Sequence, residues 1–385
     1  TRSGGSESPM NDDNLARERE SETVRRALIL TGGDDAPGLN AVLRAFVKTA
    51  TDLGIRVYGS EDGFAGLIEE PSRIIRLRPS SVQGILPKGG SVLGCSNRAN
   101  PFAYPVRTAD GTSKTADVSD RVKAVLDERQ IDSLVLVGGS GTLEIGLRLA
   151  KLGVPIVGVP KAIDNDLAIT DLAFGLDTAV ATATSAIDAL HSTGEAHDRV
   201  MILEVMGRHA GWIALMSGIA GGADVILLPE IHYDVDRITN KIRSRTKAGN
   251  RFSIIVVGEG AKPLGGTVSS INEASDVAPL RHAGSGVQLA RLLEGRIDHE
   301  VRVTILGHLQ RGGSPSSFDR LLGTRFGVHA AELCYHDNTN QVVTLRGQDI
   351  IAMPLEAAVS NHKRVPPDGE LVGVARAIGI ELGQD

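Results

Sequence analysis

Two short segments combine glycine with polar side chains in a way that suits phosphate binding. Thr31–Asn40 (TGGDDAPGLN) and Val137–Thr142 (VGGSGT) each follow an apolar run and precede a helical pattern. Glycine lets backbone N–H groups approach a phosphate closely, and a helix N-terminus adds positive potential. Either segment alone could be an ordinary strand-to-helix turn. Two such turns in one sheet favour a cradle for a single polyphosphate.

Charged side chains mark three further segments. Pro160–Asp166 (PKAIDND) places two carboxylates around an Asn after a predicted strand, where they could hold a cation or a hydroxyl. Glu204–His209 (EVMGRH) and Leu306–Pro315 (LGHLQRGGSP) combine Arg and His with glycine, which suits a phosphate or a sugar oxygen. A solvated acidic turn, a surface Arg and a structural His are the alternative interpretations.

The composition favours a soluble globular protein. The 385 residues carry 47 acidic and 41 basic side chains, 41% are hydrophobic, and only 3% are aromatic. An acidic chain with so few aromatic residues does not suit nucleic-acid binding, which needs basic grooves and stacking platforms. Cys95 and Cys334 form no CxxC pattern, so we expect a reducing cytoplasm and no disulfide scaffold. Gly211–Leu228 carries one charge but also several glycines, so it predicts a helix, a turn and a strand rather than a membrane span.

Seven apolar, β-branched runs alternate with helical patterns. Continuous apolar runs are typical of parallel strands covered on both faces, and the alternation predicts a doubly wound α/β fold in two units. The expected strands are Ala27–Thr31, Leu134–Val137, Ile156–Val159, Val200–Val205, Val225–Leu228, Ile254–Val257 and Val301–Leu306. The expected helices cover Leu39–Leu53, Leu143–Leu152, Thr178–Leu190 and Gly286–Leu293. Ligands of such sheets bind at the carboxyl ends of the strands, where the glycine segments lie.

Together the five segments resemble the 6-phosphofructokinase family. The resemblance runs from about Arg26 to Asp319 in the family's order, and phrases such as EVMGRHAGWIAL and LGHLQRGGSPSSFDR are similar to actinobacterial-type members. It implies two Rossmann-like domains around a cleft: 25–175 plus 310–360 for the donor, and 176–309 plus 361–385 for the sugar phosphate. Residues 1–24 are expected to be a tag remnant and a charged N-terminal segment.

The resemblance implies transfer of a phosphoryl group from ATP or pyrophosphate, with Mg²⁺, to the 1-hydroxyl of fructose 6-phosphate. Asp164 would be the general base, Asp166 would orient the site and the metal, and Arg208 would stabilise the moving group. The sugar-phosphate side would comprise Ala162, Arg199, Met206, Gly207, Arg208, Glu230, Arg302, His308 and Arg311. The donor side would comprise Gly33, Asp34, Arg98, Gly139, Ser140, Gly141, Thr142 and Lys161.

Two features of that pattern concern charge and assembly. Phosphoryl transfer depends mainly on positioning and on neutralising spread negative charge, so Arg, Mg²⁺ and glycine amides suit it. Arg311 would hold the 6-phosphate, while Arg199 and Arg302 would reach in from a neighbouring subunit of a homodimer or homotetramer. The expected partners are therefore small molecules and further copies of the chain.

Three residues depart from the family pattern, and all lie on the donor side. Asp34 replaces a glycine, Ser140 replaces an acid that helps to hold magnesium, and Ala162 replaces a threonine. Asp34 could bind the metal in place of the acid that is lost at position 140, because both loops would face the same phosphates. The chain is also one residue longer than the pattern around Cys95–Asn100, next to Arg98.

The sequence leaves the donor and the activity open. Lys161 is typical of pyrophosphate users, whereas Gly141 is typical of ATP users and leaves room for a nucleotide. Three functions fit: a working fructose 6-phosphate phosphotransferase, an enzyme with another acceptor or donor, and a silent sugar-phosphate-binding paralogue. The retained pair Asp164 and Asp166 favours catalysis, because two close carboxylates repel each other and have little reason to stay in a pocket that only binds.

Overall fold

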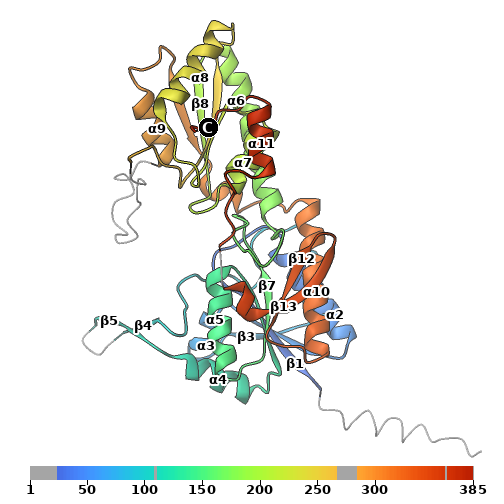
Figure 1. The fold of residues 1–385 in the computed structure, drawn as a ribbon. Coiled ribbons are helices and arrows are strands. Elements are labelled where there is room, and N and C mark those ends of the chain that lie inside the picture. Colours follow the sequence, from blue (N-terminus) through green and yellow to red (C-terminus); the bar gives the residue numbers. More distant parts are fainter. Residues whose placement is uncertain (1–23, 108–110, 267–283, 360–361, 385) are drawn as a thin grey trace, which may run out of the picture.

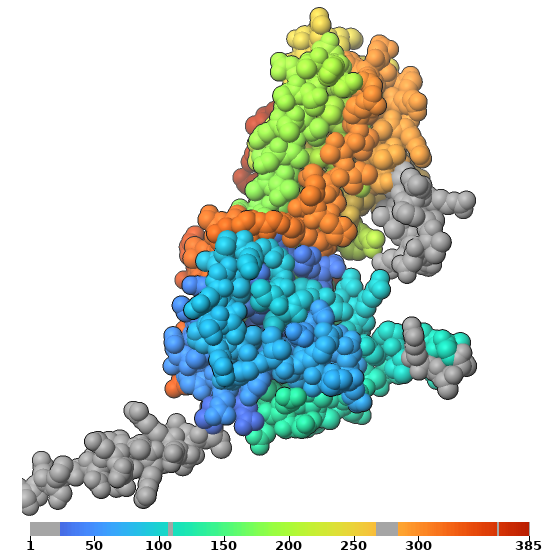
Figure 2. Space-filling view, turned by 180° about the vertical axis from the view of Figure 1, so that it is seen from behind, coloured from blue at the N-terminus to red at the C-terminus, as the bar shows by residue number. Residues whose placement is uncertain are grey.

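The computed structural model describes residues 24–107, 111–266, 284–359 and 362–384, which form two α/β lobes (Figure 1). The expected N-terminal segment lies outside these residues, as does most of the expected surface connection Leu264–Pro279. From behind, the orange chain around residues 300–335 passes from the upper lobe to the lower one (Figure 2). The fold is therefore the two-domain α/β arrangement that the strand pattern predicted.

The larger sheet has seven strands in the order β13-β12-β7-β6-β1-β2-β3. Its central strands are parallel, while β2–β3 and β12–β13 pair antiparallel at the two edges. The strands are β1 (Arg26–Thr31), β2 (Arg56–Ser60), β3 (Ile74–Leu77), β6 (Ser133–Gly138), β7 (Ile156–Pro160), β12 (Gln341–Arg346) and β13 (Asp349–Pro354). The chain leaves β1 towards β2 and leaves β6 towards β7 on the other side, which makes the β1–β6 boundary a topological switch point.

The smaller sheet is parallel throughout, in the order β11-β8-β10-β9. Its strands are β8 (Val200–Val205), β9 (Val225–Leu227), β10 (Ser253–Gly258) and β11 (Val301–Ile305). The seven predicted strands are confirmed. Four strands of the larger sheet, β2, β3, β12 and β13, were not predicted, and of these β2 and β3 are short and interrupted by Gly and Arg.

Helices cover both sheets. Around the larger sheet are α2 (Leu39–Asp52), α3 (Ala65–Ile68), α4 (Ser119–Glu128), α5 (Ser140–Lys151) and α10 (Ser317–Tyr335). Around the smaller sheet are α6 (Leu176–Ala196), α7 (Trp212–Ala220), α8 (Val235–Lys247), α9 (Ser285–Leu293) and α11 (Glu370–Ala377). No helix of the described residues is long and apolar enough to span a membrane. Cys95 is half-buried, Cys334 is buried, and both are free thiols.

A two-stranded hairpin of β4 (Tyr104–Arg107) and β5 (Ser113–Ala116) projects from the larger lobe (Figure 1). It was not predicted, because an isolated hairpin buries too little apolar surface to leave a strong pattern. Its base adjoins the segment 95–100, where the chain departs from the family pattern. This segment forms one wall of the site described below.

Asp319 ties the first turn of α10 to the first turn of α6, which belongs to the other lobe. Its fully buried carboxylate accepts hydrogen bonds from the backbone N–H of Thr178 at 2.8 Å and from the Thr178 hydroxyl at 2.5 Å. The same hydroxyl accepts a bond from the Ser316 N–H at 2.9 Å. Burial raises the pKa of Asp319, so these donors are needed to hold the carboxylate.

Replacing Asp319 by Ala is expected to lower the free energy of unfolding by about 2–3 kcal/mol, because buried donors on Thr178 lose a charged acceptor. Urea denaturation followed by circular dichroism measures the change. Asp349→Ala, on the exposed turn of β12–β13, is the matched control and should shift stability by less than about 0.5 kcal/mol. Equal losses in the two variants would contradict the importance of this tie.

Candidate active site

The two glycine loops lie side by side where β1 and β6 end. The Gly32 N–H donates to the Val137 carbonyl at 2.9 Å, so the loops start in register. The Thr142 side chain lies between them: a Cβ on Gly32 would come within 2.6 Å of its hydroxyl, and a Cβ on Gly138 would clash with it. Glycine is therefore required at both positions for close packing. Thr142, predicted to bind the donor, is buried and joins the two loops.

A cleft of about 420 Å³ opens in front of these loops. It brings together most of the predicted donor and catalytic residues: Gly33, Asp34, Gly139, Ser140, Gly141, Thr142, Lys161, Ala162, Asp164, Asp166 and Arg311. Its far end follows α5 for two turns, to Ile145 and Arg148. The Arg148 guanidinium lies 3.7 Å from the centre of the Phe102 ring, at the base of the hairpin. The cleft therefore extends beyond the two glycine loops, along α5.

Asp164 combines a buried carboxylate oxygen with a raised pKa. Its buried Oδ1 atom has no hydrogen-bond partner within the described part of the chain. Burial, followed by the nearby Asp166 carboxylate, raises the pKa of Asp164 to about 7, although the Arg311 charge opposes the shift. A carboxylate with such a pKa is poised to accept a proton near neutral pH.

Asp34 is held by contacts on both carboxylate oxygens. The Asn97 amide donates to its Oδ1 at 2.9 Å, and Arg311 lies 3.3 Å from its Oδ2. Arg311 also donates to the Asp35 carbonyl at 3.2 Å, so this side chain spans from the last segment of the site to the first loop. The Asp34 carboxylate therefore pairs with Arg311, the residue that was expected to bind the sugar phosphate.

Lys161 stabilises the first loop through hydrogen bonds to its backbone. It is buried, and its ammonium donates to the Gly32 carbonyl at 3.2 Å and to the Asp34 carbonyl. Burial lowers its pKa, and the nearby Asp34 and Asp35 charges partly offset that effect. The ammonium therefore binds backbone carbonyls of the first loop and lies close to Gly33.

Glu259 lies close enough to interact electrostatically with Asp164 and Arg311, although it was not among the residues predicted from the sequence. It directly follows β10, and its pKa is raised by burial and lowered by the nearby Arg208 and Arg311 charges. The Glu259 charge also acts on Asp164. The signal in the sequence was a Gly-Glu-Gly after a predicted strand, which is not one of the five segments.

The other predicted residues fall into separate places. Met206, Gly207 and Arg208 follow β8, and the Met206 N–H donates to Gln310 at 3.2 Å in the short 3₁₀-helix that carries His308. Arg98 lines a recess beside the first loop with Cys95 and Asn97. Glu230 accepts hydrogen bonds from the Gly211 N–H at 3.0 Å and from the Val365 N–H at 2.8 Å, so its carboxylate is used by the backbone.

Arg199 and Arg302 lie at the opposite end of the smaller sheet. Arg199 precedes β8, and a rise of 3.3 Å per residue places it about 20 Å from Met206 at the other end of that strand. Arg199 pairs with Glu300 at 2.5 Å, and Arg302 pairs with the same carboxylate. Neither residue reaches the cleft of its own chain.

Comparisons with known proteins identify the family. The family model described as Phosphofructokinase matches residues 26–334. The chain belongs to the phosphofructokinase family. It is 48% identical over 361 residues to the ATP-dependent 6-phosphofructokinase of Chloroflexus aurantiacus, covering 94% of this chain and 98% of the relative. It is also 48% identical over 343 residues to the pyrophosphate–fructose 6-phosphate 1-phosphotransferase of Streptomyces coelicolor, covering 88% of this chain and 96% of that relative.

A solved structure supports the fold. The pyrophosphate-dependent phosphofructokinase of Nitrosospira multiformis matches with a TM-score of 0.75 at 22% identity, over 94% of this chain and 93% of the other. By its family the chain is a phosphotransferase, and the solved structure supports its two-domain fold. Relatives of equal similarity carry names with different donors, so the choice of donor depends on the cleft of this chain.

Proposed function

We propose that this chain transfers the terminal phosphoryl group of ATP to the 1-hydroxyl of fructose 6-phosphate, with Asp164 as the general base. The carrying observation is the Asp164 oxygen in the cleft, which has no hydrogen-bond partner among the described residues and lies beside the donor loops and Arg311. The carboxylate would accept the hydroxyl proton while the oxygen attacks the phosphoryl group. Arg311 and Arg208 would neutralise phosphate charge, and Glu259 would accept a hydrogen bond from a sugar hydroxyl.

The shape of the cleft favours a nucleotide as the donor. Gly141 lines the cleft, and a Cβ added there would meet no atom of the described residues within 4 Å. Beyond it, Ile145 and the Arg148–Phe102 stack offer an apolar and cationic surface that suits a base. Lys161, whose type suggested pyrophosphate, already donates to two carbonyls of the first loop.

The two-donor assay tests this choice. With fructose 6-phosphate and Mg²⁺, we expect kcat/KM for ATP to exceed that for pyrophosphate by about 100-fold, which corresponds to roughly 3 kcal/mol of contacts with the base and ribose. Inorganic triphosphate is the matched control, because it has the phosphates of ATP without the nucleoside. Equal or better turnover with pyrophosphate would reject ATP as the donor.

The residues fit a magnesium ion that arrives with the donor. Within the described ranges, no group of three or more His, Cys, Asp or Glu is arranged to hold a metal by itself. Mg²⁺ commonly uses one or two carboxylates together with substrate phosphates. Asp166 and the Ser140 hydroxyl line the cleft and would hold the ion, whereas Asp34 is already paired with Arg311. The bound ion would supply neutralisation of the donor's phosphate charge.

Subunit exchange tests whether sites are shared. We expect Arg199→Ala and Asp164→Asn chains to be nearly inactive alone but to recover about one quarter of native activity when mixed as dimers, because one site in each mixed dimer is complete. The assay measures product formation after the two variants are unfolded and refolded together. Mixing two samples of Asp164→Asn is the control. Absence of recovery would contradict a contribution of Arg199 to the neighbouring site.

A second candidate function is binding of sugar phosphate without transfer. The Asp34–Arg311 pair favours it, because a carboxylate close to the donor phosphates repels them, and Ser140 supplies no charge for the metal. Calorimetry with fructose 6-phosphate would then give binding, while neither donor gives turnover. Turnover with either donor excludes this function.

A further inference from the structure

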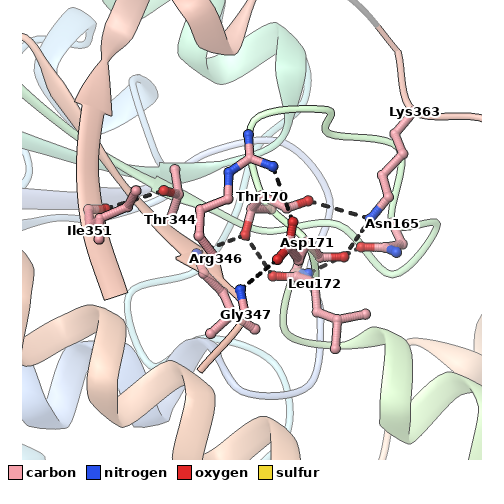
Figure 3. A network of polar contacts seen from close by, with 11 residues as sticks. Asn165, Thr170, Asp171, Leu172, Thr344, Arg346, Gly347, Ile351 and Lys363 are labelled. Atoms are coloured by element: carbon pink, nitrogen blue, oxygen red, sulfur yellow. Dashed lines mark hydrogen bonds and ion pairs between the residues drawn. The ribbon is translucent and has the colours of Figure 1, made fainter. Parts of the chain in front are cut away.

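The segment His362–Val365, which we name the clasp, crosses the loop that carries Asp164. This loop, residues 161–175, connects β7 of the larger sheet to α6 of the smaller lobe. The clasp lies beyond residue 334, where the match to the family model ends. The contacts between the two segments are shown in part in Figure 3.

The Asp164 loop has little regular structure of its own. Asn165 lies between the two acidic residues with a φ of 50°, and its buried side chain accepts a hydrogen bond from the Ala173 N–H at 3.2 Å. This contact closes the loop on itself, and the buried Ile163, Leu167 and Phe174 side chains pack the loop into the cores of the two lobes, but these contacts do not involve the two carboxylates. Contacts from outside the loop must therefore set the direction of the carboxylates.

The outer end of the loop is held by the β12–β13 hairpin (Figure 3). The Leu345 N–H donates to the Thr170 hydroxyl at 3.0 Å, and the Asp171 N–H donates to the Leu345 carbonyl at 2.9 Å. The Asp171 carboxylate pairs with Arg346 at 3.0 Å and accepts the Gly347 N–H at 2.7 Å. These contacts fix Thr170 and Asp171 to the larger lobe.

Lys363 connects the part of the loop next to Asp164 with its outer part at Thr170 and Asp171. Its backbone N–H donates to the Asp166 carbonyl at 2.8 Å, and its ammonium donates to the Thr170 carbonyl at 3.4 Å and to the Asp171 carbonyl. The Lys363 ammonium also lies 5.4 Å from the centre of the Trp212 ring, at the start of α7 in the smaller lobe. The side chain is half-buried, so these carbonyls replace much of its water.

The other end of the clasp is fixed to the smaller lobe. Val365 is buried in the core of that lobe, and its N–H donates to Glu230, which also accepts from the Gly211 N–H. The clasp thus runs from an anchored carboxylate in one lobe to the Asp164 loop, whose far end is held by the other lobe. This gives Glu230 a role that the sequence did not indicate.

We infer that Lys363 is a positioning residue, which holds Asp164 and Asp166 towards the cleft by fixing their loop against the hairpin and the smaller lobe. The inference rests on the proposed function. Loss of the ammonium leaves the backbone bond to Asp166 in place, so the fold is retained while the loop gains freedom. Misplacement of a reacting group by about 1 Å costs up to 100-fold in rate.

The test compares Lys363→Met with Lys363→Arg and with Lys241→Met. Lys241 is the matched control, because its ammonium also donates to a carbonyl, that of Gly379, far from the loop. For Lys363→Met we expect kcat to fall about 10-fold, with both KM values within about twofold of native. Lys363→Arg, which keeps the charged donor, should restore kcat to within about threefold of native.

Amide hydrogen exchange supplies a readout that needs no activity. Exchange of the peptide covering 164–173 should rise about 10-fold in Lys363→Met and stay native in Lys241→Met. If the chain turns over no donor but this exchange rises, the clasp stands and the proposed function fails. Native exchange in Lys363→Met, a kcat equal to that of Lys241→Met, or a rise in KM alone would overturn the positioning role.

Discussion

Replacing Asp164 by Asn is expected to lower kcat about 1000-fold, with the KM for fructose 6-phosphate changed by less than about threefold. Asn keeps the size of the side chain but cannot accept the hydroxyl proton, and general bases contribute about 100- to 10,000-fold. The buried Asp164 oxygen, which has no partner in the part of the chain that the structure describes, is free to act in the chemical step. Steady-state kinetics with saturating donor measure both constants.

The pH dependence of the same reaction checks the role of Asp164. Because burial and Asp166 raise the pKa of Asp164 to about 7, the base is protonated and inactive below that pH. We therefore expect kcat/KM to rise with pH and to level off above about 7 to 8. Asp164→Asn should lose this acid limb, whereas Asp349→Asn, an exposed control, should retain it. An unchanged acid limb in Asp164→Asn would assign the titration to another group.

Replacing Arg311 by Met is expected to raise the KM for fructose 6-phosphate about 100-fold. The guanidinium lies at the cleft with 17% of its side chain exposed, and loss of such a charged donor costs about 3 kcal/mol, or two powers of ten. The KM for ATP should change much less, because the donor is held mainly by loop amides. Kinetics with each substrate varied in turn separate the two effects.

The pair of Asp34 with Arg311 is expected to weaken the binding of the sugar phosphate. Its carboxylate pairs with Arg311 at 3.3 Å, so it competes with a sugar phosphate for the same cation. Asp34→Asn should lower the KM for the sugar phosphate by about threefold, a modest change because the Asp34 side chain is 51% exposed and screened by water. In the Arg311→Met background the same substitution should have no effect on this KM. Equal effects in both backgrounds would show that Asp34 acts independently of Arg311.

Local sequence carried most of the fold and most of the donor site. The seven predicted strands need only a continuous apolar run, because parallel strands covered on both faces contain little else. The glycine loops are similarly local, since the strand end, the glycine and the helix start are adjacent in the chain. Gly33, Gly139 and Asp164, which the motifs and the family resemblance predicted as site residues, all line the cleft.

Contacts between distant segments could not be predicted in this way. Arg311 and Asp34 are separated by most of the chain, and only the packing of the two lobes brings their charges within 3.3 Å. Glu259 comes close to the charges of Arg208 and Arg311 because β10 lies beside β8 in the smaller sheet, an order that no local pattern encodes. Glu230 carried the family's motif, yet the tertiary structure gives its oxygens to the Gly211 and Val365 amides.

The sequence by itself determined the chemistry available to this protein, because the types of residue and their positions after strands are properties of single segments. Only the tertiary structure decided how that chemistry is controlled. Lys363 shows the reason: an ordinary lysine in a charged stretch, it acquires a role because three carbonyls of the Asp164 loop and the Trp212 ring lie around it. Such a position depends on where both lobes place their ends, which is a property of the whole fold.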